Sequence, residues 1–215
     1  MTCVRALGLL ACAALPCAEN IARASDIALA PPDERQCSLG PEIPDALRAK
    51  RRCVAAERVI LPDTPVSARI PHNYVCSSAS TSMFEGMEAH VVECLPFAGG
   101  QGISLEKEIG SHVPTSLQAQ LEEWKARATK EPAMSVVPPH SVRASDRDAI
   151  EEASKGNAFF DGPNLHSTGQ ILVHRLIIQD GTDFYECSTM TMASSYTQEL
   201  RDRLHEFCDS LTFKN

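Results

Sequence analysis

The chain has 215 residues and a formal net charge of −8. This acidic balance argues against nucleic acid and anionic lipid as partners, whereas it is compatible with a basic protein partner. The length suits one domain with a sizeable core, so we expect packing to supply most of the stability.

The first 24 residues have the pattern of an export signal. Arg5 supplies a positive charge, an apolar run covers residues 6–18, and Ala22–Ala24 offers small residues at a cleavage site. We therefore expect residues 1–24 to be a signal peptide that is cleaved near Ala24, which gives a periplasmic or secreted protein.

A lipoprotein is the alternative, because Leu9–Cys12 is similar to a bacterial lipobox and would attach lipid to Cys12. The apolar run over residues 6–18 is too short to span a bilayer, which takes about 20 residues. No later stretch approaches that length, so the sequence predicts no integral membrane segment.

Six further cysteines form three pairs of neighbours along the chain. An even number behind an export signal indicates an oxidising compartment and a disulfide framework. Other connectivities stay open, but the nearest-neighbour choice predicts the bonds Cys37–Cys53, Cys76–Cys94 and Cys187–Cys208.

The first half of the chain reads as a lead-in followed by β structure. Prolines and weak periodicity predict an irregular lead-in over residues 25–52. We expect residues 53–215 to form a single α+β domain. In chain order we first expect a strand at Cys53–Leu61 and a turn at Pro62–Pro65. A hairpin follows, in which Tyr74–Ser80 pairs with Met87–Phe97 around a loop at Phe84–Gly86. Residues 98–113 are rich in glycine and are expected to form a loop. The hairpin register sets Cys76 opposite Cys94, where a cross-strand disulfide is reasonable.

The middle of the chain contains one clear helix. Apolar residues at helical spacing follow a start signal at Thr115 or Ser116, so Pro114–Lys130 is predicted to be helical with a stripe of Leu117, Leu121, Trp124 and Ala128. Beyond it we expect a short strand at Met134–Val137, stopped by Pro138 and Pro139, and a short polar helix at Ser145–Lys155.

The last third predicts a hairpin and a helix. Asp180-Gly181 between β-rich runs is typical of a two-residue type I′ turn, so Gly169–Gln179 pairs with Thr182–Met192 and Leu176 faces Tyr185. A capping box at Ser195–Gln198 then opens a helix whose core stripe includes Leu200, Leu204, Phe207 and Leu211. The chain closes with a short strand at Leu211–Phe213.

The order of these last elements resembles the Mog1/PsbP-like fold, which includes the DcrB-type bacterial envelope proteins. The residues that carry the resemblance are Leu172–Ile178, Asp180-Gly181, Phe184–Met192, Tyr196–Phe207 and Asp209–Phe213. The resemblance implies an α/β sandwich in which helices pack on one face of an antiparallel sheet. It also implies a role in binding or assembly, and no catalytic residue is common to the family.

Chemical motifs point to no enzyme site. The seven histidines show no i, i+4 pair, and the chain contains neither C-x-x-C nor G-x-S-x-G. Glu122-Glu123 and Glu151-Glu152 are adjacent carboxylates that point in different directions on a helix, so we interpret them as solvated. We therefore predict no catalytic residue, no cofactor and no metal site.

Two loops are the better candidates for binding, because loops on a rigid scaffold carry recognition. They contain Phe159, Phe160 and Asp161, and Gly99, Gly100 and Gln101. Core packing of the two phenylalanines is the alternative.

We therefore expect a non-enzymatic exported binding protein, most concretely a periplasmic immunity-type inhibitor that occludes a basic envelope-acting toxin or hydrolase. One alternative is an envelope assembly or lipid-handling factor of the Mog1/PsbP/DcrB type. Another is a hydrolase whose site is assembled from distant residues such as His166, Asp161 and Ser188.

Overall fold

The computed structural model describes residues 35–51, 53–84, 87–108, 113–162 and 165–214. The predicted signal peptide and Cys12 lie outside these residues. The strands of the first half are β1 (Gln36–Ser38), β2 (Val54–Ala55), β3 (Arg58–Ile60), β4 (Val66–Arg69), β5 (Tyr74–Phe84), β6 (Met87–Pro96) and β7 (Ile103–Lys107). Those of the second half are β8 (Ser135–Ala144), β9 (Arg147–Gly162), β10 (Leu165–Asp180), β11 (Asp183–Met192) and β12 (Thr212–Phe213). The helices are α2 (Asp45–Arg51), α3 (Leu117–Lys130), the 3-10 turn η3 (Ala193–Ser195) and α4 (Gln198–Asp209).

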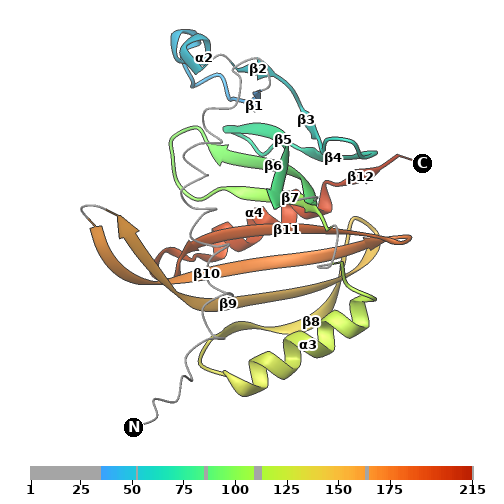
Figure 1. The fold of residues 1–215 in the computed structure, drawn as a ribbon. Helices are drawn as coiled ribbons and strands as arrows, with labels where there is room; N and C mark the ends of the chain where they lie inside the picture. The colour runs from blue at the N-terminus through green and yellow to red at the C-terminus, as the bar shows by residue number, and fades with distance from the viewer. Residues whose placement is uncertain (1–34, 52, 85–86, 109–112, 163–164, 215) are drawn as a thin grey trace.

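The strands form a nine-stranded sheet in the order β2-β1-β5-β6-β7-β11-β10-β9-β8 and a three-stranded sheet in the order β12-β4-β3 (Figure 1). Every pair is antiparallel except β1 with β2. The predicted α+β class with an antiparallel sheet is confirmed. No helix of the described residues has the length and apolar character needed to cross a bilayer.

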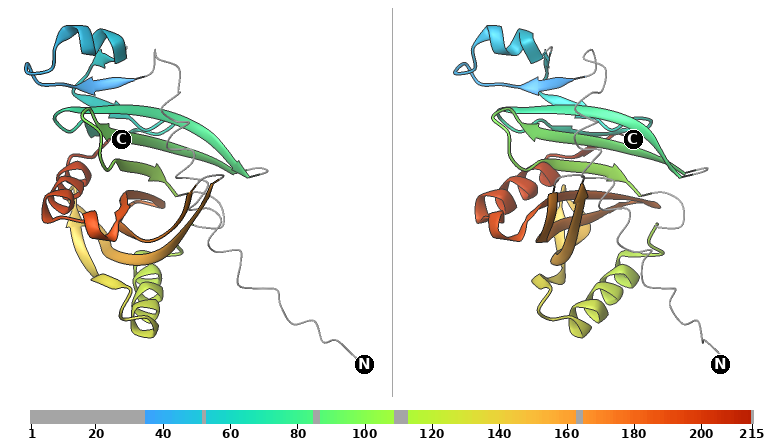
Figure 2. Two further views of the ribbon diagram at one scale, coloured as in Figure 1. Left: turned by 90° about the vertical axis from the view of Figure 1, so that its left-hand side faces the viewer. Right: turned by 60° about the vertical axis from the view of Figure 1, so that its left-hand side comes forward.

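The helices α3 and α4 pack on opposite faces of β9–β11, whereas the resemblance implied one face (Figures 1 and 2). The α3 side chains Leu121 and Trp124 contact a cluster with Ile177, and the α4 side chains Leu204 and Phe207 join the core that contains Leu176. Successive residues of a strand point to opposite faces, so β10 is apolar on both sides and receives a helix on each. The start of α3 is capped by Ser116, whose hydroxyl accepts from the backbone N–H of Ala119 at 3.1 Å.

Strand β7 lies in the segment 98–113, for which a loop was the prediction. Ile103 and Leu105 are both buried and alternate with more exposed residues, which is the period of a strand. The glycines just before β7 obscure that short pattern. Because β7 pairs with β6 on one side and β11 on the other, it joins the two halves of the large sheet.

The helix predicted over residues 145–155 is wrong, because this segment begins strand β9. Ser145 and Asp146 have positive φ angles of 50° and 61° and form the two-residue turn between β8 and β9. Such turns most often carry Asn-Gly or Asp-Gly, so the Ser-Asp pair hides the hairpin. Strand β8 continues through Pro138 and Pro139 because it borders the sheet, where a missing N–H is tolerated.

The two predicted hairpin registers have different outcomes. Cys76 lies opposite Cys94, as expected. In the later hairpin, the turn is Gly181-Thr182, so Leu176 lies opposite Cys187 and not opposite Tyr185. Gly181 has a φ of +62°, and glycine at the first turn position is the pattern of a type II′ turn. The two-residue shift leaves every side chain on its predicted face.

The cysteines also give a mixed outcome. The disulfides Cys37–Cys53 and Cys76–Cys94 are present. Cys187 and Cys208 are buried free thiols, so the third predicted bond is wrong. Both thiols belong to one core cluster, in which α4 packs on β11 without a covalent link between these two residues. The predicted irregular lead-in also differs from the structure, since residues 35–51 contain β1 and α2.

Candidate functional site

The sheet face that carries α3 also carries a row of charged side chains across four strands. The strand register sets Glu152 opposite Arg175, and Glu106 opposite Glu186. The side-chain oxygens of Glu106, Glu108 and Glu186 lie within 4.8 Å of one another. We call these three residues the carboxylate cluster.

Arg175 is the cation that faces the carboxylate cluster, and it also contacts Glu152 and Trp124. Its Nε donates to Glu152 Oε1 at 2.9 Å, and its Nη1 lies 3.8 Å from Glu186 Oε2. The guanidinium carbon also lies 5.1 Å from the centre of the Trp124 ring, which contributes a cation–π contact. Arg127 of α3 donates to the same Glu152 oxygen. Glu152 is thus doubly paired, whereas Arg175 is the one cation of the described residues that faces the three carboxyls.

This shortage of positive charge alters the acidity of the cluster. Burial, with the nearby carboxylates of Glu186 and Glu108, raises the pKa of Glu106 to about 8 against the opposing effect of Arg175. Burial and the charge of Glu186 raise the pKa of Glu108 to about 7. Burial also raises the pKa of Glu186. The cluster therefore retains protons near neutral pH, and an incoming cation could replace them.

The acidic character of this face extends to β6. Glu93 lies opposite Ser104 of β7, so its side chain is on the same face as Glu106. Its Oε2 is buried with no hydrogen-bond partner among the described residues, and burial raises its pKa.

The predicted binding loops lie away from the carboxylate cluster. The aromatic segment is part of β9 and not a loop: Phe159, Phe160 and Asp161 pair with Thr168, Ser167 and His166 of β10. Phe159 is seven residues from Glu152, or roughly 23 Å along the strand. Gly99 and Gly100 have positive φ angles, and with Gln101 they lead from β6 into β7.

The fold does not assemble the hydrolase site that the sequence allowed. Asp161 and His166 are paired across β9 and β10, but Ser188 lies opposite Arg175. His166 is nine residues from Arg175 along β10, which corresponds to about 30 Å. The Ser188 hydroxyl instead lies 2.9 Å from the Ser104 hydroxyl.

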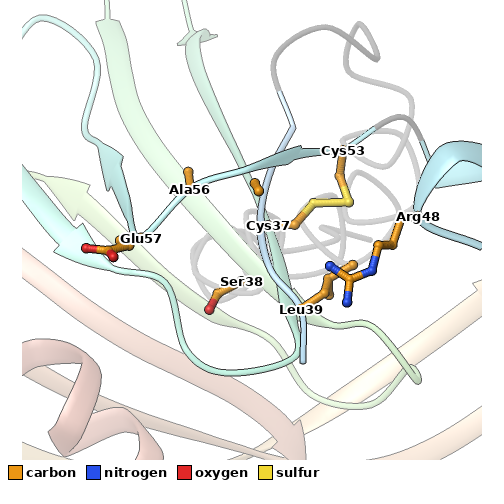
Figure 3. Close-up of a pocket in the computed structure, with 8 residues that line it drawn as sticks. Cys37, Ser38, Leu39, Arg48, Cys53, Ala56 and Glu57 are labelled. Carbon is orange, nitrogen blue, oxygen red and sulfur yellow. A yellow bond between two sulfur atoms is a disulfide. The ribbon is translucent and has the colours of Figure 1, made fainter. Parts of the chain in front are cut away.

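A pocket of about 360 Å³ lies beside the Cys37–Cys53 disulfide (Figure 3). Its lining includes Arg48 and Glu57. Arg48 donates to the backbone carbonyls of Gly40 and Ile43, so its guanidinium is already used to hold the loop before α2. The most prominent charge of the pocket therefore has a structural role.

No protein-family model and no curated protein matches this chain. Among solved structures, the chain is similar to a crystal structure from Bacteroides thetaiotaomicron VPI-5482, with a TM-score of 0.42 and 15% sequence identity. The match covers 74% of this chain and 49% of that chain, so the chain spans about half the length of the protein it matches. We draw no functional conclusion from this similarity.

Proposed function

We propose that the protein is an exported, non-enzymatic binding protein that receives a basic protein partner at the carboxylate cluster. The observation that carries this proposal is the excess of carboxyls over cations around Arg175. The two disulfides support an oxidising compartment, such as the periplasm or the exterior of the cell.

The concrete form of the proposal is an immunity-type inhibitor of an envelope-acting toxin. A lysine or arginine of the toxin pairs with Glu106 and Glu186 and displaces the protons that they hold. The net charge of −8 accelerates the encounter with a basic protein. Occlusion of the active-site cleft then leaves the toxin folded but inactive.

Affinity capture tests this proposal with two matched variants. The double variant Glu106→Gln/Glu186→Gln removes two carboxyls of the cluster, and Glu122→Gln/Glu123→Gln removes two exposed carboxyls of α3. We expect wild type and the α3 variant to retain one basic protein stoichiometrically from envelope extract or medium. The cluster variant should bind it roughly tenfold or more weakly, because a desolvated charge pair is lost. The isolated partner must also lose its activity when the protein is added.

A second measurement determines whether the carboxylate cluster releases protons when the partner binds. Binding enthalpies near pH 7 in buffers of different ionisation enthalpy should show proton release by wild type, and less by the cluster variant. Equal retention of the partner by both double variants would remove the cluster from the mechanism. Purification with bound lipid and no protein would instead favour the assembly or lipid-handling role that the Mog1/PsbP resemblance implies.

A further inference from the structure

Three histidines converge on one buried carboxylate on the opposite face of the sheet, under α4. Glu151 of β9 is 1% exposed, and its Oε1 lies 2.8 Å from His174 Nε2 and 3.0 Å from His205 Nε2. His140 Nε2 lies 3.4 Å from the other oxygen, Oε2. The four residues come from β8, β9, β10 and α4, so residues distant in the sequence meet at one point.

The second nitrogen of two of these rings is already occupied. His140 Nδ1 lies 2.8 Å from the carbonyl oxygen of Pro138. A carbonyl can only accept, so this nitrogen carries the hydrogen and the neutral ring turns its Nε2 lone pair toward Glu151. His174 Nδ1 lies 3.0 Å from Tyr196 Oη. Metal-binding histidines are oriented in this way by a partner at the second nitrogen.

The charge of Glu151 is balanced without any of the histidines. Arg201 donates to Glu151 Oε1 at 3.0 Å, and this single cation already balances one carboxylate. The imidazoles of His174 and His205 at the same oxygen complete a donor set of nitrogen and oxygen that suits a divalent transition metal. Calcium and magnesium prefer oxygen ligands alone.

The distances fit a small metal ion. Glu151 Oε1 and the Nε2 atoms of His174 and His205 lie within 4.8 Å of one another. Ligands at about 2.0–2.1 Å in a tetrahedral zinc site are separated by roughly 3.3 Å, so the contacts of 2.8 and 3.0 Å need only a small expansion. We propose that Glu151, His174 and His205 bind a divalent transition-metal ion of the zinc class, and that His140, on the other oxygen of Glu151, orients this carboxylate from the outer shell.

Arg201 is the built-in competitor of the metal. Its guanidinium occupies Oε1 in the metal-free protein, and its side chain is 32% exposed, so it has a route to swing into solvent. His205 and His140 are also partly exposed, which gives the ion an entry path at the same rim. Removing the arginine charge therefore strengthens metal binding, which is the opposite of what a purely structural ion pair predicts.

Calorimetric titration of the EDTA-treated, dialysed full chain with zinc chloride tests this site, with magnesium chloride as the control ion. We expect one zinc per chain and no magnesium binding at the site. His205→Gln and His140→Gln should each weaken zinc binding by about tenfold or more, since loss of even an outer-shell partner costs this much. Arg201→Gln should tighten it. His72→Gln is the matched control, because His72 is an exposed histidine outside the cluster.

Two further measurements establish that the variants are folded and that the ligands are nitrogen and oxygen. Urea unfolding in EDTA shows whether each variant is folded, and the two substituted histidines at the rim leave the buried His174 in place. The cobalt(II) spectrum should show nitrogen and oxygen ligation without a thiolate charge-transfer band. The proposal is overturned by absence of stoichiometric zinc binding, by unchanged affinity in the folded His205 and His140 variants, by a thiolate band, or by weaker binding in Arg201→Gln.

Discussion

Cys187 and Cys208 are two thiols that touch in the core of the molecule. Burial and the neighbouring Cys187 raise the pKa of Cys208, so its thiolate, the reactive form, is suppressed. We expect both cysteines to resist iodoacetamide in the native protein and to be alkylated in guanidinium chloride without reductant. Peptide mass spectrometry reads each site, and the four disulfide cysteines serve as the unlabelled control. Failure of both residues to react in the unfolded protein would mean that they are bonded.

Gly181 lies in a hairpin turn and Gly156 lies within a strand, so the same substitution at both positions separates backbone strain from chain entropy. Gly181 has a φ of +62°, whereas Gly156 lies inside β9 and an added Cβ there would meet only Ile171 Cγ1 at 3.8 Å. We expect Gly181→Ala to lower the free energy of unfolding by about 1–2 kcal/mol through backbone strain. Gly156→Ala should be neutral or raise it by roughly 0.5–1 kcal/mol, because alanine loses less entropy in a strand. Urea unfolding of both variants checks the opposite signs.

Local sequence patterns predict those elements whose signals are complete within a short stretch. Helix α3 combines an apolar stripe with the Ser116 cap, and the Cys76–Cys94 pairing follows from alternation along one hairpin. Strand β9 fails this test because Glu151 and Glu152 look solvated in sequence, yet both are buried. Their burial depends on His174 and Arg175 of the neighbouring strand, and such distant partners cannot be read from a single segment.

The candidate site was hidden for the same reason. Glu106 and Glu108 fall in a segment that glycines mark as a loop, and Glu186 lies some eighty residues later. Only the pairing of β7 with β11 brings them together. Alternation over Ile103–Lys107 was the one local signal that could have revealed β7, although it would not have identified its partner.

The carboxylate cluster should set the pH dependence of stability for the whole molecule. A carboxyl with a raised pKa in the folded state binds its proton more tightly there, so it disfavours folding once the pH exceeds its unfolded value. The loss of stability begins above pH 4.5, the ordinary pKa of a glutamate, and is complete above about pH 8, the raised pKa of Glu106. We expect the Tm to fall between about pH 5 and about pH 8, and Glu106→Gln/Glu186→Gln to flatten this slope. An equal slope in both proteins would contradict the assignment.

Reduction of the two disulfides should weaken the whole fold. The bonds close loops with sequence separations of 16 and 18, and each is worth about 3 kcal/mol in the chain-entropy model. A phosphine reductant should therefore lower the urea midpoint substantially. Cys187→Ala/Cys208→Ala is the control, and it should lose as much on reduction as wild type because those residues are already thiols. A smaller loss in this variant would indicate a third bond.

The two outermost strands of the nine-stranded sheet affect how readily copies of the protein pair edge to edge at high concentration. One border is β8, where Pro138 and Pro139 lack the N–H groups that a passing strand would need, and the other is β2, which has two residues. Neither of these two strands offers a long template for an additional strand. Edge-to-edge pairing of two copies through β8 or β2, a first step toward cross-β stacking, is therefore disfavoured even at high protein concentration.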